Sequence, residues 1–447
     1  MKQLKKTKDL TTGSPGKLLL FFSLPLMAGN IFQQLYTFVD TAVVGKVLGV
    51  EMLAALGAVE WLNWLVLGII QGFTQGFGIL MAQNFGAAEY KKLRKTVANA
   101  VLLSLICAVL LTGLSQGMMN GILILLGTPE GIRPVSVSYL RILFAGTPVV
   151  MAYNLAACVL RALGDGKTPL HAMILASVIN IGLDFLFVMG FDWGVQGAAG
   201  ATILAQLFSA VYCVKQICRI EILAMKKEDW RLTGVLCKKL MLLGMPMAFQ
   251  NSVISIGGMI VQTVVNGFGV AFIAGFTATN KLYGLLETAA TSYGYAMVTY
   301  AGQNMGAGKK KRIFMGMKAG MLISLATSLM ITLLMLLFGR AVLSCFISAD
   351  AEQGTQALNI AFKYLRIMSL CLPVLYVLHI TRSCIQGLGN TVLPMLSGFA
   401  EFAMRTGAAL LLPLILGENG IFYAEILAWL GADFILIPSY FITVKKI

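Results

Sequence analysis

Long apolar stretches alternate with short polar segments along the chain. An apolar stretch that crosses a bilayer as a helix needs roughly 17–25 residues. Backbone polar groups inside lipid must be hydrogen-bonded within the segment itself, so each stretch is predicted to be a helix. The predicted spans are 18–45, 53–82, 97–117, 136–160, 169–190, 195–217, 240–266, 272–302, 314–337, 360–384, 392–416 and 421–443. The pattern therefore predicts an all-α integral membrane protein of twelve transmembrane helices.

Proline interrupts five of these spans, at Pro25, Pro148, Pro246, Pro373 and Pro413. A proline inside a helix removes one backbone hydrogen bond and clashes with the preceding turn. Within a membrane, neighbouring helices can cover the carbonyl groups that this frees. We therefore expect kinks in these helices.

Polar and proline landmarks recur in the same order in the two halves of the chain. The run 83–87 (Gln-Asn-Phe-Gly-Ala) returns at 303–307 as Gln-Asn-Met-Gly-Ala, and a basic cluster follows each copy. The run 139–142 (Tyr-Leu-Arg-Ile) returns unchanged at 364–367. An internal repeat of this kind, with six spans in each copy, predicts two pseudo-symmetric six-helix lobes. The N-terminal lobe is expected at 1–220, a cytoplasmic linker at 221–236 and the C-terminal lobe at 237–447.

The even number of spans in each copy determines the symmetry of the predicted lobes. Both copies then cross the membrane in the same orientation, so the pseudo-two-fold axis runs along the membrane normal. Parallel repeats of this type place a substrate cavity between the lobes, and alternating access moves one lobe against the other. The repeat therefore favours a secondary transporter.

Composition and charge support a lipid-facing surface. The chain is 58% hydrophobic and only 12% charged, whereas about a quarter of a soluble domain is charged. The net charge of +15 could suit nucleic acid, but the basic residues gather in alternate loops, as the positive-inside rule describes. We therefore expect no nucleic-acid partner, lipid headgroups beside the basic loops, and a multi-pass protein of a bacterial inner (plasma) membrane with both termini cytoplasmic.

Ionisable residues inside the predicted spans indicate a coupling site, because each costs about 2.5–3.5 kcal/mol on insertion scales. Asn180 and Asp184 share one face of the fifth span, and Asp40 lies on the polar stripe of the first. Carboxylates among neutral oxygens suit a proton or a hard cation such as Na⁺. The matching positions of the second half hold Val261 and Ala409, so coupling is predicted in the N-terminal lobe.

Other polar side chains are candidates to line a substrate cavity. They are Gln33, Gln34, Thr37, Gln206, Asn251, Gln262, Asn266 and Glu287. A plainer interpretation stays open for all of these polar residues, since buried amides, hydroxyls and acids also serve as interhelical hydrogen-bond partners. Glu287 could pair with Lys281, and His379 is interpreted as a packed core histidine. Glu401, Glu425 and Asp433 receive no assignment.

Three features together resemble the multidrug and toxic compound extrusion (MATE) family. These are the twelve spans in two parallel lobes, the early helix that runs from Pro25 to Asp40, and the twice-repeated Gln-Asn-x-Gly-Ala before a basic loop. The turn at 161–169 (Arg-Ala-Leu-Gly-Asp-Gly-Lys-Thr-Pro) also fits, and the resemblance covers essentially the whole chain. It implies an exporter of cationic, often aromatic, drugs in exchange for Na⁺ or H⁺.

The resemblance also implies a particular cation site. In the branch of the family with an acidic first lobe, the site uses an Asp on the first helix, an Asn on the fourth, Asn-x-x-x-Asp on the fifth and a Thr on the sixth. This sequence has Asp40, Asn154, Asn180, Asp184 and Thr202 at those places. If Na⁺ is the coupling ion, Asp40, Asn180 and Asp184 are expected to ligate it.

Other classes of function fit less well. A flippase for a lipid-linked cell-envelope precursor stays the alternative, although an anionic headgroup would favour several arginines in the cavity and few positive residues lie inside the spans. A channel would need no coupling carboxylates. No HExxH or P-loop motif occurs, so we predict no enzyme and no cofactor. We expect a monomer whose partners are small cationic drugs and membrane lipids.

Overall fold

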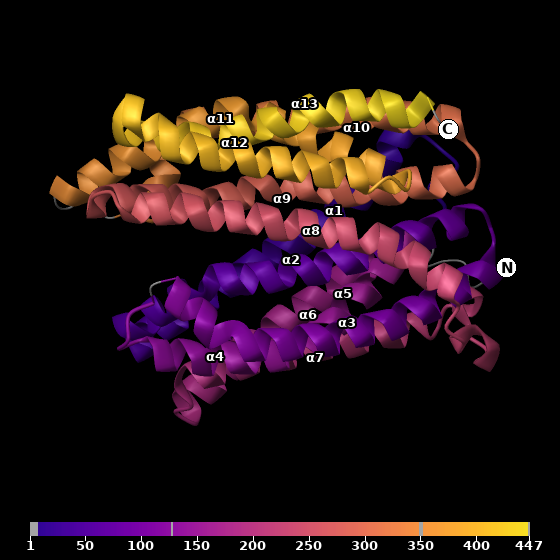
Figure 1. The fold of residues 1–447 in the computed structure, drawn as a ribbon, viewed down its shortest axis with the longest axis horizontal. Helices are drawn as coiled ribbons and strands as arrows, with labels where there is room; N and C mark the ends of the chain where they lie inside the picture. The colour runs from indigo at the N-terminus through magenta and orange to yellow at the C-terminus, as the bar shows by residue number, and fades with distance from the viewer. Residues whose placement is uncertain (1–7, 127, 348–351, 446–447) are drawn as a thin grey trace. The chain divides into compact units, whose positions relative to one another are not determined.

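The computed structural model describes residues 8–126, 128–347 and 352–445. These residues form thirteen α-helices and contain no β-strand (Figure 1), which confirms the all-α prediction. The helices are α1 (Pro15–Val43), α2 (Val50–Gly86), α3 (Tyr90–Leu125), α4 (Arg133–Ala145), α5 (Thr147–Ala162), α6 (Lys167–Asp184), α7 (Gly194–Ile217), α8 (Gly234–Asn266), α9 (Val270–Gly306), α10 (Lys310–Ser344), α11 (Glu352–Gly387), α12 (Val392–Leu416) and α13 (Ala424–Lys445). Single π-helical turns follow α1 at Val44–Leu48 and α6 at Phe185–Gly190.

The predicted span at 136–160 is a pair of helices. The axes of α4 and α5 meet at an angle of 46°, next to Gly146. Pro148 lies in the first turn of α5, where the missing N–H of proline has no helical partner to lose. The predicted kink is therefore a bend between two helices.

Nine helical segments of the described chain are long and apolar enough to cross a membrane, and the bent pair makes ten. One of the nine contains both α12 and α13, which the 3₁₀ segment Gly417–Tyr423 joins. Helix α9 is as long as α2, at 37 residues, but Lys281 and Glu287 lower its hydropathy. With α9 included, and with α12 and α13 counted separately, the fold has the twelve predicted crossings.

The backbone contacts divide the chain into two compact units. Unit 1 comprises Met1–Thr12, Leu24–Ala248 and Gly302–Gly308, and unit 2 comprises Gly13–Ser23, Phe249–Ala301 and Lys309–Ile447. In unit 1, α7 packs along both α5 and α6, and α2 packs against α5. Buried apolar side chains of these helices, among them Phe77, Met81 and Leu160, form its main core.

The segment after α7 is held against α3 in unit 1. Asn99 of α3, which is fully buried, accepts a hydrogen bond from the Thr233 backbone N–H at 3.0 Å and donates to the Arg231 carbonyl at 3.2 Å. The Nε of Arg94 lies 3.5 Å from a carboxylate oxygen of Asp229. The polar linker is therefore an ordered part of this unit.

The repeated Gln-Asn-x-Gly-Ala runs come together in unit 1. A Cβ on Gly86 would overlap the carbonyl oxygen of Gln303, and a Cβ on Gly306 would overlap that of Gln83. The ends of α2 and α9 can approach this closely only because both positions are glycine. The Gln303 side chain accepts from the backbone N–H of Leu10 at 2.9 Å, which ties the N-terminal segment to the crossing.

Unit 2 is a bundle in which α10 packs along α11, and α13 packs against both α11 and α12 (Figure 1). Stacked aromatic rings link its helices. Phe422 stacks on Phe272 and on Tyr364, with ring centroids 5.4 Å and 4.9 Å apart. Phe276 stacks on the same Tyr364 at 4.9 Å, so α9, α11 and the segment before α13 share one aromatic core.

Candidate functional site

Helices α5, α6 and α7 place the predicted cation-site residues of unit 1. Asn180 and Asp184 lie one turn apart near the end of α6, with 1% and 0% of their surface exposed. Thr202 lies on α7, which packs along α6, and is half-buried. Asn154 lies on α5, which also packs against α7, and is half-buried.

Helix α1 runs beside α6 in the same direction. A Cβ on Gly29 would lie 3.7 Å from Leu170, and the Ser177 hydroxyl donates to the Phe32 carbonyl at 3.4 Å. At 1.5 Å rise per residue, Asp40 lies roughly 12 Å beyond Phe32, and Asp184 lies roughly 10 Å beyond Ser177. The two carboxylate-bearing positions are therefore at the same level, although the Asp40 side chain lies outside the described residues.

Two buried amides in this region have unused hydrogen-bonding atoms. Within the described part of the chain, neither side-chain polar atom of Asn180 has a partner, and neither does the side-chain oxygen of Gln206. Buried polar groups are almost always hydrogen-bonded, so each exception in a protein interior needs an explanation. An ion or a water between α6 and α7 would satisfy these atoms.

The two remaining residues of the predicted site keep oxygen atoms available. The Thr202 hydroxyl donates to the Ala198 carbonyl at 3.1 Å, and the Asn154 amide N–H donates to the Val150 carbonyl at 2.9 Å. Each bond uses a donor, so the oxygen lone pairs of both side chains can still accept. The donor set is carboxylate, amide and hydroxyl oxygen, which suits a hard cation or a proton.

A small apolar cluster adjoins this polar region. Val43 and Val44 at the end of α1 pack with Val188, Val195 and Ala198. The π-helical turn that contains Val188 begins directly after Asp184, and Thr202 lies one turn beyond Ala198. π-Helical turns occur frequently at functional sites, and here two of them flank the ends of the helices that carry Asp40 and Asp184.

The residues predicted to line a substrate cavity are divided between the two units. Gln33, Gln34, Thr37 and Gln206 belong to unit 1, whereas Asn251, Gln262, Asn266 and Glu287 belong to unit 2. In unit 1, the Thr37 hydroxyl donates to the Gln33 carbonyl at 3.0 Å. In unit 2, the Gln262 amide donates to Asn266 at 2.8 Å. Their role in a cavity stays a prediction.

Unit 2 contains a buried ion-pair network to which the sequence led us to assign no role. Glu401 of α12 accepts from Arg382 of α11 at 2.7 Å and from Arg405 at 3.0 Å. Arg405 also donates to Glu425 of α13 at 2.7 Å. The spacing of Glu401 and Arg405, four residues apart on one helix, is the one signal in the sequence for this network.

Glu287 and His379 form a further polar contact in unit 2. The Nε2 atom of His379 on α11 lies 3.3 Å from a carboxylate oxygen of Glu287 on α9. The interpretation of His379 as a packed core histidine is therefore incomplete, because its ring faces a carboxylate. Hydropathy and spacing could not reveal this pair, since its two members are on helices far apart in the sequence.

The fold agrees with comparisons to known proteins. A sequence profile of the MatE family matches residues 25–186 and 246–406. "Probable multidrug resistance protein YpnP" of Bacillus subtilis (strain 168) is 31% identical, with 93% of this chain and 92% of that protein covered. "Probable multidrug resistance protein NorM" of Thermotoga maritima is 26% identical over 86% of this chain and 82% of its own length.

A solved structure has the same fold. The outward-facing conformation of a multidrug resistance MATE family transporter superposes with a TM-score of 0.92 at 21% identity, and it covers 100% of this chain and 99% of its own. That likeness concerns the twelve-helix, two-lobe architecture, while the profile and the YpnP match concern the sequence. The chain therefore belongs to the MATE family of membrane transporters.

Proposed function

We propose that this protein is a multidrug exporter that moves cationic and aromatic compounds out of the cell by antiport with H⁺ or Na⁺. One observation carries the proposal: amide and carboxylate oxygens of Asn180, Asp184 and Gln206 are buried in the interior of unit 1. An ionisable residue inside a membrane span, such as Asp184, marks an ion or proton pathway by default. The family and the names of its similar members supply the drug-export context.

The proposed cycle begins when a proton or Na⁺ binds at Asp40 and Asp184. Binding neutralises the buried negative charge of these carboxylates. The first-lobe helices then pack in a different arrangement, and this rearrangement releases the drug on the outer side. Linkage requires the reverse effect as well, so drug binding must weaken cation binding by the same factor. We place both termini in the cytoplasm of a bacterium, with the chain in its plasma membrane, because the basic loops alternate along the chain.

The charges of unit 2 favour a cationic or neutral cargo over the lipid-linked precursor of a flippase. A site for an anionic headgroup needs arginines with unused positive charge. Arg382 and Arg405 are both engaged by carboxylates within hydrogen-bonding distance. Neither arginine is free to hold a phosphate, and no catalytic role is proposed for any part of the chain.

The test is ethidium efflux from proteoliposomes that contain the purified protein, with a pH gradient or a Na⁺ gradient imposed separately. We expect efflux under one gradient, and the gradient that drives it identifies the coupling ion. Liposomes without protein and dissipation of each gradient by an ionophore are the controls. Absence of efflux under both gradients, from protein that remains folded, would contradict the exporter proposal and favour the flippase.

A further inference from the structure

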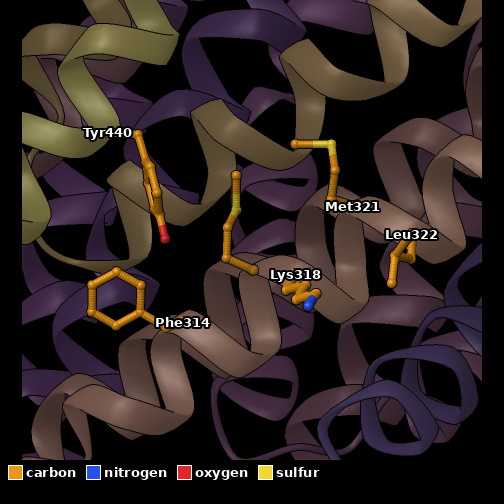
Figure 2. Close-up of a pocket in the computed structure, with 6 residues that line it drawn as sticks. Phe314, Lys318, Met321, Leu322 and Tyr440 are labelled. Atoms are coloured by element: carbon orange, nitrogen blue, oxygen red, sulfur yellow. The ribbon is translucent and has the colours of Figure 1, made fainter.

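A shallow apolar groove lies on unit 2 where α13 passes α10. It has a volume of about 430 Å³ and is lined by Phe314, Met317, Lys318, Met321 and Leu322 of α10 and by Tyr440 of α13 (Figure 2). Phe314, Lys318 and Leu322 are each four residues apart, so they share one face of α10. The lining of the groove is therefore apolar, with a single positive charge near its middle.

The groove faces outward rather than into the protein. Phe314 and Leu322 are 52% and 61% exposed, and α10 is among the most hydropathic of the candidate membrane spans. Large apolar side chains that are exposed on a membrane-spanning helix contact lipid. The volume falls within the range of about 300–1,000 Å³ that is usual for small-molecule sites, which is enough for part of an acyl chain.

Lys318 is the charged residue among those that line this groove. Its side chain is exposed, and no ion pair joins it to any described residue. The buried Arg382 and Arg405 of the same unit are each paired with glutamate. An unpaired lysine in a span is costly unless its ammonium group reaches the interface or an anion.

The position of Lys318 along α10 fits a lipid headgroup. The helix begins at Lys310, directly before Lys311 and Arg312, so Lys318 lies roughly 12 Å along the helix from this basic end. A lysine at this depth extends its methylene stem along apolar surface and directs the ammonium group toward the headgroups. Tyr440 lies near the end of α13, and Figure 2 shows its ring on the side of the groove near Phe314.

We propose that this groove binds one anionic phospholipid, whose acyl chain lies along Phe314, Met321 and Leu322 and whose phosphate contacts the Lys318 ammonium. A zwitterionic headgroup carries its own cation, so it gains less from Lys318. The binding needs only that the protein lies in a membrane, and it does not depend on drug export or on the coupling ion.

The test is native mass spectrometry of the full chain in detergent that contains equal amounts of phosphatidylglycerol and phosphatidylcholine. We expect the wild type to retain phosphatidylglycerol preferentially. One lysine near an anionic headgroup contributes about 1 kcal/mol, so Lys318→Gln should lower bound phosphatidylglycerol about fivefold and leave phosphatidylcholine unchanged. Lys311→Gln, which removes an exposed lysine on the same helix outside the groove, is the matched control.

A second pair of variants tests the acyl-chain half of the groove. Leu322→Trp fills the groove and should reduce retention of both lipids, whereas Leu329→Trp, at another exposed position of α10, should reduce neither. Unchanged retention of phosphatidylglycerol by Lys318→Gln would overturn the proposal. Equal losses in Lys318→Gln and Lys311→Gln would also overturn it, because the effect would then be one of net charge.

Discussion

At the scale of single residues, the protein contains two kinds of buried polar group. Asn180 and Gln206 in unit 1 have polar atoms with no partner in the described chain, whereas Glu401 in unit 2 accepts from two arginines. An unpaired buried amide costs stability, and a buried ion pair becomes strongly destabilising when one of its partners is removed. The first kind is suited to bind a ligand, and the second kind is suited to hold helices together.

Asn180→Leu should therefore increase stability and abolish transport. Leucine has a similar size and no polar atom, so replacing the unpaired amide is expected to raise the free energy of unfolding by about 1–3 kcal/mol. The same change removes an oxygen donor from the proposed cation site, so gradient-driven efflux should be lost. Thermal unfolding in detergent and efflux are measured side by side, with the exposed Asn120→Leu as the control. A destabilised variant that still transports would contradict the prediction.

Glu401→Gln should have the opposite effect on stability. The change leaves Arg382 without its carboxylate partner, while the Nη2 atom of Arg405 keeps Glu425. Breaking a buried pair by removing one partner costs about 3–5 kcal/mol. We expect a clear drop in the melting temperature in detergent. Glu418→Gln, which alters an exposed carboxylate of the same unit, should melt like the wild type. Equal melting of the two variants would show that the network contributes nothing.

At the scale of helices, close contacts determine which segments belong together. The crossing of α2 and α9 rests on Gly86 and Gly306, and the docking of the linker on α3 rests on Asn99. In the helix crossing, a glycine without a side chain meets backbone atoms of the other helix. In the docking of the linker, one asparagine side chain bonds backbone atoms of the linker. Each can therefore be tested with one substitution.

Gly306→Ala should weaken the crossing, because its Cβ would overlap the Gln83 carbonyl oxygen. Overpacking of this kind typically costs about 1–3 kcal/mol, so we expect a lower melting temperature. Gly117→Ala on α3, whose Cβ would meet open space, serves as the control and should be neutral or slightly stabilising. Identical melting of Gly306→Ala and the wild type would mean that the helices separate at no cost.

Asn99→Ala should release the linker from α3. The Thr233 N–H and the Arg231 carbonyl lose their side-chain partner, so the basic segment around Lys226 and Lys227 is expected to open more often. Limited trypsin digestion, followed over time, should cleave this variant faster than the wild type and faster than Asn120→Ala. Equal cleavage rates would show that other contacts hold the linker.

The sequence predicted where the helices lie along the chain better than which helices pack against one another. Apolar length determined the spans because the lipid permits only internally bonded helices. The bend was predicted at Pro148 but lies at Gly146, because a proline in the first turn is compatible with the start of a helix and does not break the helix. The contact between Glu287 and His379 could not be predicted, because helical spacing gives the face of each residue but not which helix lies opposite.

At the scale of the whole molecule, we propose that the first lobe is responsible for coupling. The carboxylate of Asp184 is fully buried, Asp40 lies at the same level on the adjacent helix, and the matching positions of the second half are Val261 and Ala409. Three acids of unit 2, Glu287, Glu401 and Glu425, are engaged instead with Arg382, Arg405 and His379. Loss of the first-lobe carboxylates should thus abolish coupling while the fold persists.

The most direct measurement of this claim compares the initial rate of gradient-driven ethidium efflux from proteoliposomes for four proteins. These are the wild type, Asp184→Asn, the Asp40→Asn, Asp184→Asn double variant, and Asp192→Asn as a control that alters an exposed acid at a positive φ, which asparagine tolerates. We expect both variants at Asp184 to lose about tenfold or more of the gradient-dependent rate, while Asp192→Asn keeps it. Full gradient-dependent efflux by a folded double variant would show that coupling does not depend on the first-lobe carboxylates.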